Sequence, residues 1–274
     1  RIGRKASGHN CMHFEVVNKT FRHCLTSDKM LLKFMCSIAV LLPSVFLMGC
    51  VDAAVLPTPC AHPDASVPSD DPEVKVYFGC GCFWHVQHEF VVEEMTKLCH
   101  TGSNLTARTA YAGGTHTQGG LVCYHNSMGK ADYGQLGHSE VVSLSMPVSA
   151  FPSFAEKFWE ICPKGVRRDV QDVGGEYRSV VGLPGGIHSS LMPELRASAT
   201  AKLVPGKGND GDTLGSDTVL VYDTSDFPAH VAEKYHQFHD DMLDRYGDAY
   251  HAFRQYAQTT QCPGDQSSWP SFVS

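Results

Sequence analysis

The sequence predicts an α/β domain, a single body in which a mixed sheet is flanked by helices. Short apolar runs such as 74–78 have the length and composition of buried strands. They alternate with longer segments whose apolar residues recur at helical spacing, which is typical of α/β domains. A chain of 274 residues, 42% of them hydrophobic, is long enough to bury the core of one such domain.

The expected elements follow from these patterns in chain order. Strands are expected at 74–78, 108–112, 140–144, 178–182 and 218–222, the last of these being the final strand. Helices are expected at 83–98, 151–161 and 191–203. The segment 230–256 contains no Pro, and we expect one long helix or two abutting ones there. The glycine-rich stretch 206–215 predicts a flexible loop.

Residues 1–54 are expected to be a targeting segment outside the domain. The chain starts with Arg1 rather than Met, and we expect the stretch before Met30 not to belong to the native protein. From Met30 an apolar run interrupted by Pro43 and followed by small residues is typical of a signal peptide. A membrane anchor is the alternative, although the uninterrupted apolar length is below the roughly 20 residues that span a bilayer. We therefore expect the secretory pathway or an organelle.

Composition sets the remaining boundaries and argues against one class of partner. Residues 55–72 are rich in Pro, Ser and Asp and predict a linker, so the catalytic domain is expected at 73–260 and a tail at 261–274. From residue 55 onward the chain has 15 Lys and Arg against 26 Asp and Glu. An acidic body of this kind argues against nucleic acid as a partner.

Cysteine usage points to disulfides and to at least one thiol. Cleavage near Ala53 would leave seven cysteines, and an odd number cannot all be paired within the chain. A secretory route permits bridges among the others. The seven are Cys60, Cys80, Cys82, Cys99, Cys123, Cys162 and Cys262.

Cys82 is the candidate nucleophile because it lies where a predicted strand meets a predicted helix. Unpaired N–H groups and the peptide dipoles at a helix N-terminus stabilise a thiolate, the nucleophilic form of cysteine. Phe83 and Trp84 follow directly and can wall an apolar pocket. The alternative is an inert buried thiol, which is the common role of a cysteine outside disulfides.

The run from Gly81 to Trp84, GCFW, resembles the active-site signature of peptide-methionine sulfoxide reductases of the A type. The resemblance continues through further segments in the same order and spans residues 74–237. These segments are YAGG at 111–114, GHSEVV at 137–142, FWE at 158–160, QDVGGEYRS at 171–179 and AEKYHQ at 232–237.

The resemblance implies a ferredoxin-like core and the reduction of the S epimer of methionine sulfoxide, free or in proteins, as in protein repair under oxidative stress. It also implies that no cofactor is bound and that an external dithiol of the thioredoxin type is the reductant. We expect a monomer that binds no metal.

The same resemblance implies a role for each site residue. Cys82 would attack the sulfoxide sulfur and become a sulfenic acid, while Phe83 and Trp84 hold the substrate methyl group. Glu140 would give a proton to the sulfoxide oxygen, because oxide cannot leave unprotonated. Such an acid must be buried, since desolvation raises the pKa of a carboxyl group.

Polar groups would complete the pocket around the sulfoxide oxygen. Asp172 and Tyr177 are the expected members, although Asp172 in a turn can also simply bond its own backbone. The family has another pocket tyrosine, for which Tyr124 and Tyr133 are candidates and Tyr124 is preferred. Tyrosine hydroxyls can donate to the oxygen as charge develops there.

A second thiol is needed to resolve the sulfenic acid as a disulfide. Family members commonly use cysteines of a C-terminal tail, which makes Cys262 the first candidate. Cys80 and Cys123 are the other candidates. A direct bridge from Cys80 to Cys82 would be strained, so a structural role for Cys80 stays open.

Two rival interpretations remain at this point. Cys80 and Cys82, with His236 and His239, are possible zinc ligands, but the spacing of a zinc site is missing. A catalytically inactive secreted binding module could also keep the scaffold and lock its cysteines in disulfides. The state of Cys82 discriminates, because a permanent disulfide there would favour the binding module.

Overall fold

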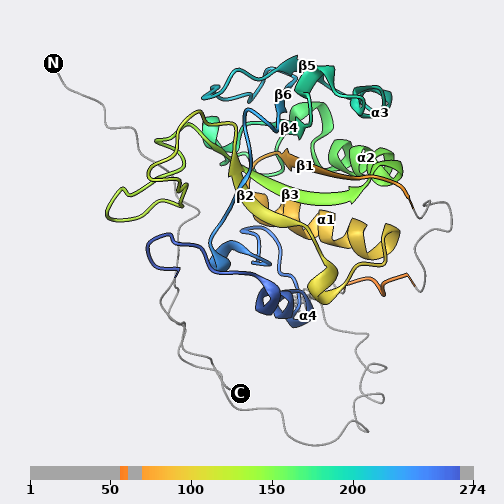
Figure 1. Cartoon of the computed structure of the whole chain (residues 1–274), viewed down its shortest axis with the longest axis horizontal. Helices are drawn as coiled ribbons and strands as arrows, with labels where there is room; N and C mark the ends of the chain where they lie inside the picture. Colours follow the sequence, from red (N-terminus) through yellow and green to blue (C-terminus); the bar gives the residue numbers. More distant parts are fainter. Residues whose placement is uncertain (1–55, 61–69, 266–274) are drawn as a thin grey trace, which may run out of the picture. The chain divides into compact units, whose positions relative to one another are not determined.

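The computed structural model describes residues 56–60 and 70–265, which contain one seven-stranded sheet with the order β5-β6-β4-β1-β3-β2-β7 (Figure 1). The strands are β1 (Glu73–Gly79), β2 (Arg108–Ala112), β3 (Ser139–Pro147), β4 (Val180–Leu183), β5 (Lys202–Pro205), β6 (Thr218–Asp223) and β7 (His230–Val231). β1 pairs antiparallel with β3 and β4, and β2 pairs antiparallel with β3 and β7. β6 pairs in parallel with β4 and β5, so the predicted mixed sheet is confirmed.

Two helices cover one face of the sheet, as Figure 1 shows. The helices of the described chain are α1 (Phe83–Lys97), α2 (Phe151–Ile161), α3 (Met192–Ala197) and α4 (Asp248–His251). Phe78 of β1 stacks on Phe90 of α1, with ring centroids 4.8 Å apart, and on Phe158 of α2 at 5.3 Å. Because one side chain contacts both, α1 and α2 lie side by side on the face from which Phe78 projects.

The opposite face of the sheet is covered by loop residues. Tyr77, Val141 and Tyr222 form a buried apolar cluster there, against which Phe227 packs. The Tyr77 hydroxyl donates to the Phe227 carbonyl oxygen at 3.0 Å, which ties the loop after β6 to β1. A side chain at Gly182 would lie 2.2 Å from the Tyr77 ring, so only glycine fits beneath it.

Three disulfides fasten the described chain, and Cys82 is in none of them. They join Cys60 to Cys99, Cys80 to Cys162 and Cys123 to Cys262. Cys60 lies within the predicted linker, and its N–H also donates to the Met95 carbonyl oxygen of α1 at 3.1 Å. That part of the linker is therefore attached to the helix, while the domain boundaries stay predictions.

The predicted leader 1–54, with the segment from Met30, lies outside the described residues, as do 61–69 and 266–274. Within 56–60 and 70–265, no helix is long and apolar enough to cross a membrane.

Most predicted elements match the structure, but the expected helix 191–203 is wrong in its second half. α3 ends at Ala197, and residues from Lys202 form β5. Leu203 pairs with Val219 in a parallel ladder with β6. Strand pairing has overridden the helical propensity of this alanine-containing stretch, and the sheet therefore has an edge strand that the sequence pattern did not indicate.

The expected long helix at 230–256 is also wrong. His230 and Val231 form the short strand β7, so 218–222 is not the last strand. Phe238 has a φ of +53°, which no α-helix accommodates. The Asp240 carboxylate accepts from the Tyr246 N–H at 2.8 Å, so a side chain takes a backbone partner that a helix would supply.

The aromatic contact between β1 and the two helices gives a stability prediction. Phe158→Ala should lower the free energy of unfolding by about 3–5 kcal/mol, because a fully buried ring is lost and a cavity remains. Chemical denaturation of both proteins measures this change. Val170→Ala, at an 82% exposed position, is the control and should change stability by less than about 0.5 kcal/mol. A similar effect of the two substitutions would contradict the packing described for Phe158.

Candidate active site

The site is built on the turn that joins β1 to α1. Gly81 has a φ of +75°, which favours glycine, and Cys82 is the N-cap residue of α1 in an extended conformation. A side chain at Gly79 would lie 2.5 Å from the Glu140 carbonyl oxygen, so glycine lets β1 end close against β3. The Gly81 N–H donates to the Tyr177 carbonyl oxygen at 3.1 Å. The turn therefore holds Cys82 against two other segments.

Two carboxylates accept the first backbone N–H groups of α1. The Cys82 N–H donates to Asp172 Oδ2 at 2.8 Å, and the Phe83 N–H donates to Glu140 Oε2 at 2.9 Å. Helix N-termini leave such donors without partners inside the helix, and their dipoles favour negative charge. Both carboxylates therefore accept from backbone N–H groups that lie at Cys82 or one residue after it.

Glu140 is fully buried at the start of β3. It pairs with Tyr111 across the ladder to β2, which fixes its backbone. Its Oε1 accepts from the Tyr133 hydroxyl at 3.3 Å. One oxygen of the carboxyl group thus accepts from the N-terminus of α1 and the other accepts from Tyr133, and the group is buried away from water.

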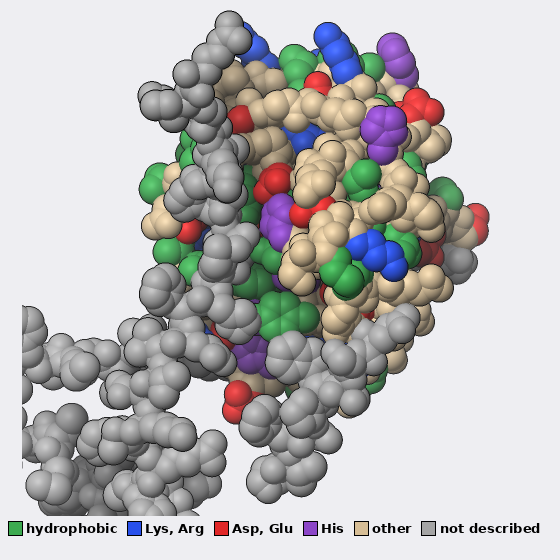
Figure 2. Space-filling model, turned by 90° about the vertical axis from the view of Figure 1, so that its left-hand side faces the viewer, with side chains coloured by type: hydrophobic (Ala, Val, Ile, Leu, Met, Phe, Trp, Pro, Cys, Tyr) green, Lys and Arg blue, Asp and Glu red, His purple; other side chains and the backbone are tan. Residues whose placement is uncertain are grey.

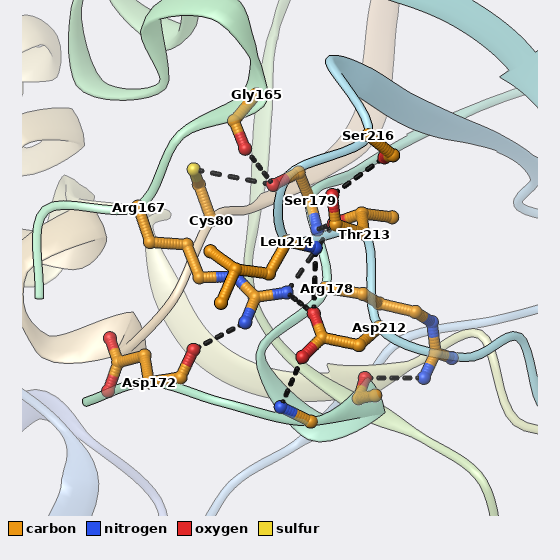
Figure 3. Close-up of polar contacts among 12 residues, drawn as sticks. Cys80, Gly165, Arg167, Asp172, Arg178, Ser179, Asp212, Thr213, Leu214 and Ser216 are labelled. Carbon is orange, nitrogen blue, oxygen red and sulfur yellow. Dashed lines mark hydrogen bonds and ion pairs between the residues drawn. The ribbon is translucent and has the colours of Figure 1, made fainter. Parts of the chain in front are cut away.

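Asp172 lies in the loop that follows α2, and the buried Arg167 bonds its backbone. Burial raises the pKa of Asp172 to about 6, although the hydrogen bond from the Cys82 N–H opposes part of the rise. Figure 3 shows Arg167 beside it, donating to the Asp172 carbonyl oxygen and forming an ion pair with Asp212. Asp172 is therefore within reach of protonation near neutral pH.

Aromatic rings wall the site on the side away from the carboxylates. Phe83 and Trp84 are buried, and the Phe83 ring centroid lies 5.3 Å from that of His236. Trp84 stacks on His239 at 4.2 Å. Tyr124 also contacts His236, with centroids 4.3 Å apart. Burial lowers the pKa of His236 to about 3, so this ring is neutral at physiological pH.

Two polar atoms of this wall are buried and have no hydrogen-bond partner among the described residues, namely Trp84 Nε1 and His236 Nδ1. A cavity of about 160 Å³ adjoins the wall and is lined by Tyr124, Tyr235 and His236, with Glu233. Figure 2 views the molecule from the left-hand side of Figure 1 and shows histidine and acidic side chains close to hydrophobic ones on this face. The wall therefore offers apolar surface together with unsatisfied polar groups to a ligand.

The segment 232–237 is attached to the site through side chains. Glu233 accepts from the Tyr111 hydroxyl at 2.9 Å and from the Tyr124 N–H at 2.8 Å. Gln237 bonds both backbone groups of Thr109 in β2. The neighbouring Phe238 N–H donates to the Gln87 side-chain oxygen of α1 at 2.6 Å. These contacts place His236 beside Phe83, in a segment that forms one short 3₁₀ helix, Lys234–His236.

Comparison with known proteins gives partial matches to one family. No protein-family model matches the chain. Peptide methionine sulfoxide reductase MsrA of Geobacter metallireducens is 31% identical over 118 residues, covering 41% of this chain and 62% of the relative. The MsrA of Geobacter sulfurreducens is 31% identical over 112 residues, covering 39% and 59%. A solved structure, methionine sulfoxide reductase A of Corynebacterium diphtheriae, is 19% identical, with a TM-score of 0.39 over 66% of this chain and 81% of that one.

The chain is similar to both curated relatives over about three fifths of each relative's length.

Most of the predicted site residues lie together in the structure. Glu140 and Asp172 meet at the start of α1, and Tyr177 contacts the same turn through its backbone. Of the two tyrosine candidates, Tyr133 is the one that donates to Glu140. Tyr124, which we preferred from the sequence, packs on the Tyr133 ring with centroids 5.8 Å apart. The roles of both tyrosines stay predictions.

The three predicted resolving thiols are all bridged to partners other than Cys82. Cys80 is joined to Cys162, and Cys123 is joined to Cys262. The zinc alternative loses one ligand, because a cysteine sulfur in a disulfide is not a thiolate. His236 and His239 instead pack on Trp84, with ring centroids 5.9 Å and 4.2 Å away.

Sequence reasoning missed part of the aromatic wall. Tyr111 and His236 belong to the segments that carry the family resemblance, yet we assigned no role to Tyr111 and considered His236 only as a possible zinc ligand. His239 follows the last of these segments. Gln87 of α1 accepts from the Phe238 N–H and so anchors the segment that carries the wall. The signal available was the presence of polar residues at positions of α1 that face the core.

The raised pKa of Asp172 predicts a pH dependence of stability. Between the ordinary value near 4 and the native pKa of about 6, the folded chain binds more protons at Asp172 than the unfolded chain does. The contribution of this group to the free energy of unfolding therefore falls as pH rises through that window. Asp172→Asn cannot titrate, and its amide oxygen can still accept from the Cys82 N–H.

The free energy of unfolding of Asp172→Asn, measured relative to that of wild type, should therefore increase as pH rises from about 4 to about 7. Urea denaturation of both proteins at several pH values measures the difference. A difference that is constant over this range, or that changes in the opposite sense, would show that the carboxyl group is not held as described.

Proposed function

We propose that this chain is a peptide-methionine (S)-S-oxide reductase that reduces the S epimer of methionine sulfoxide, free or in proteins. The observation that carries the proposal is the convergence of two buried carboxyl groups on the backbone beside one cysteine. Glu140 and Asp172 accept the N–H groups of Phe83 and Cys82 at 2.9 and 2.8 Å. The Geobacter relatives, which are named as reductases of this kind, support the same activity.

Cys82 would act as the nucleophile on the sulfoxide sulfur. Its position at the N-cap of α1 places the sulfur at the positive end of the helix dipole, where a thiolate is favoured. Attack forms an S–S bond to the sulfoxide sulfur as the sulfoxide oxygen takes up a proton. Transfer of the resulting hydroxyl group to the Cys82 sulfur then breaks both the S–S and the S–O bonds to the substrate sulfur, and the products are methionine and the sulfenic acid of Cys82.

Glu140 would supply that proton. Its complete burial disfavours the charged carboxylate, which suits a group that must be protonated before the reaction. The Tyr133 hydroxyl, 3.3 Å from Glu140 Oε1, is placed to stabilise the carboxylate that remains after the transfer. Asp172 and Tyr177 would complete the polar side of the pocket.

The aromatic wall would hold the substrate methyl group. Phe83 and Trp84 lie directly after the nucleophile and pack against His236 and His239. A neutral imidazole and aromatic rings form an apolar surface, and Trp84 Nε1 and His236 Nδ1 add unsatisfied polar groups for the oxygen or the substrate backbone. The acid and the methyl-binding pocket would have fixed positions around the chiral sulfoxide sulfur, which would explain why one epimer is selected.

Turnover would need a second thiol and an external reductant. The Cys82 sulfenic acid condenses with a thiol, which forms a disulfide and releases water. A dithiol of the thioredoxin type then reduces the disulfide by thiol–disulfide exchange and is itself oxidised. No bound cofactor takes part in these steps.

The alternative of an inactive binding module would have the cysteines locked in structural bridges. Six cysteines of the described chain are indeed bridged, but Cys82 is in none of the three disulfides. The position of that thiol beside two carboxyl groups favours the enzyme.

We also propose that the protein is made along a secretory route. Disulfides persist in oxidising compartments and are rare in the cytosol, and three of them in one small domain support this assignment. The signal-like pattern from Met30 supports the same route.

The first functional test is a dithiothreitol-driven assay with each epimer of a methionine sulfoxide peptide. Wild type should reduce the S epimer, and Cys82→Ser should lose at least about 1,000-fold in rate because the nucleophile is gone. The double variant Cys60→Ser/Cys99→Ser, in which a distant bridge is removed, should keep the activity. Preference for the R epimer, or activity that survives in Cys82→Ser, would refute the proposal.

The second functional test addresses the acid. In Glu140→Gln the amide oxygen can still accept from the Phe83 N–H, but no acidic proton is present. Single-turnover methionine formation should therefore slow by about 10²–10⁴-fold. Glu156→Gln, on the exposed side of α2, is the control. A Glu140→Gln rate within about twofold of wild type would exclude Glu140 as the proton donor.

A further inference from the structure

We propose that Cys80 and Cys162 form the dithiol that resolves the Cys82 sulfenic acid, so that the bridge between them is a working redox pair. This inference rests on the proposed reductase function. It assigns the resolving role to a cysteine two residues before the nucleophile, with a partner at the end of α2.

The first support is position. Cys80 and Cys82 are separated only by Gly81, and two peptide units span at most about 7 Å between Cα atoms. Cys80 is also 6.0 Å from Cys162, Cα to Cα, within their disulfide. Cys80 is therefore adjacent to both the nucleophile and Cys162. The Cys60–Cys99 bridge, in contrast, lies beyond the far end of α1, whose 15 residues extend over about 22 Å.

The second support is the charge around the bridge. Cys80 Sγ lies 3.6 Å from Ser179 Oγ and 3.6 Å from the Val166 carbonyl oxygen, and Figure 3 shows the contact with Ser179. The next residue, Arg167, packs its aliphatic stem against Gly81 and is buried. Its Nε has no hydrogen-bond partner among the described residues. The Ser179 hydroxyl donates to the Gly165 carbonyl oxygen at 2.9 Å, so the buried cation with its unsatisfied Nε is the group that would stabilise a thiolate when the bridge opens.

The third support is access. A cavity of about 430 Å³ is lined by Ile161 and Pro163, which flank Cys162, and by Val166, which contacts Cys80. His85, one turn after Cys82 on α1, also lines it. The cavity therefore borders the residues next to the bridge, on a side different from the cavity at the aromatic wall, while Cys80 and Cys162 themselves are buried.

The chemistry balances in three steps. The Cys80 thiol condenses with the Cys82 sulfenic acid, which gives a Cys80–Cys82 disulfide and water. The Cys162 thiolate attacks the Cys80 sulfur, forms the Cys80–Cys162 disulfide and releases the Cys82 thiolate. An external dithiol reduces Cys80–Cys162 and becomes a disulfide itself. A bridge across one residue is strained and readily exchanged, so the second step runs toward Cys80–Cys162. The described structure, with that bridge closed and Cys82 outside it, corresponds to the end of the second step.

The three steps form a relay from Cys82 through Cys80 to Cys162. The number of methionines formed per chain, without continuous reductant, tests this relay. The chain is reduced with dithiothreitol, separated from it and given excess S sulfoxide peptide. Wild type should form about two methionines per chain, one that oxidises the dithiol and one that leaves Cys82 as a sulfenic acid. Cys80→Ser and Cys162→Ser should each form about one. The sulfenic acid should be captured by a 1,3-diketone probe after one equivalent of substrate in Cys80→Ser, but not in wild type.

Two matched double variants are the controls. Cys60→Ser/Cys99→Ser and Cys123→Ser/Cys262→Ser each remove one of the other bridges and should still form about two methionines. About one methionine from wild type, or from Cys123→Ser/Cys262→Ser, would overturn the relay while the reductase function stands. No methionine from wild type would overturn both.

A measurement on wild type alone covers the case in which a variant fails to fold. After one equivalent of sulfoxide, thiols are alkylated and disulfides are mapped by mass spectrometry. Cys162 lies on the tryptic peptide 158–164, and Cys80 and Cys82 share the peptide 76–97, where fragment ions distinguish them. A Cys80–Cys162 bridge with Cys82 alkylated is expected. A new bridge from Cys82 to Cys262 or Cys123 would refute the proposal.

Discussion

The site and the fold depend on the same interaction, the acceptance of the first N–H groups of α1 by two buried carboxyl groups. Burying a carboxyl group without partners is costly, whereas a helix N-terminus supplies both donors and a favourable dipole. Glu140 comes from β3 and Asp172 from the loop after α2, at sequence separations of 57 and 90 residues from their partners. The helix can therefore begin at Phe83 only when the sheet and that loop are in place. The sulfur of Cys82 is positioned by the same closure.

Local patterns predicted the parts of the fold that are locally determined. The strand 108–112 and the helix 151–161 have in the structure the bounds expected from the sequence. In both segments the spacing of apolar residues is that of the element formed, and the apolar residues are buried within the sheet or against it. The site residues Cys82, Glu140 and Asp172 were found through short motifs, but their hydrogen bonds to the helix terminus were not. Those bonds depend on how β1, β3 and the loop pack together, which no single segment determines.

The failure at 230–256 has a physical cause, the capture of backbone groups by distant side chains. Residues 230–256 lack Pro and have helix-compatible residues, yet the Gln87 side chain takes the Phe238 N–H and Gln237 docks on β2. Helix propensity of a fraction of a kcal/mol per residue cannot outweigh such contacts and the burial that accompanies them. The disulfides were equally beyond the sequence, because pairing of several cysteines has many solutions until the fold is known.

The charges around Cys82 set a limit on how the site can work. A thiolate at Cys82 and a carboxylate at Asp172 share one helix terminus, and two negative charges so close disfavour each other. Burial, which raises the pKa of Asp172 to about 6, eases this conflict by allowing the carboxyl group to take up a proton at little cost. Arg167, buried behind Gly81 and bonded to the Asp172 backbone, provides the compensating positive charge. It also forms an ion pair with Asp212, and its Nε has no hydrogen-bond partner among the described residues. For the proposed thiolate at Cys82, this arrangement favours a protonated, neutral Asp172.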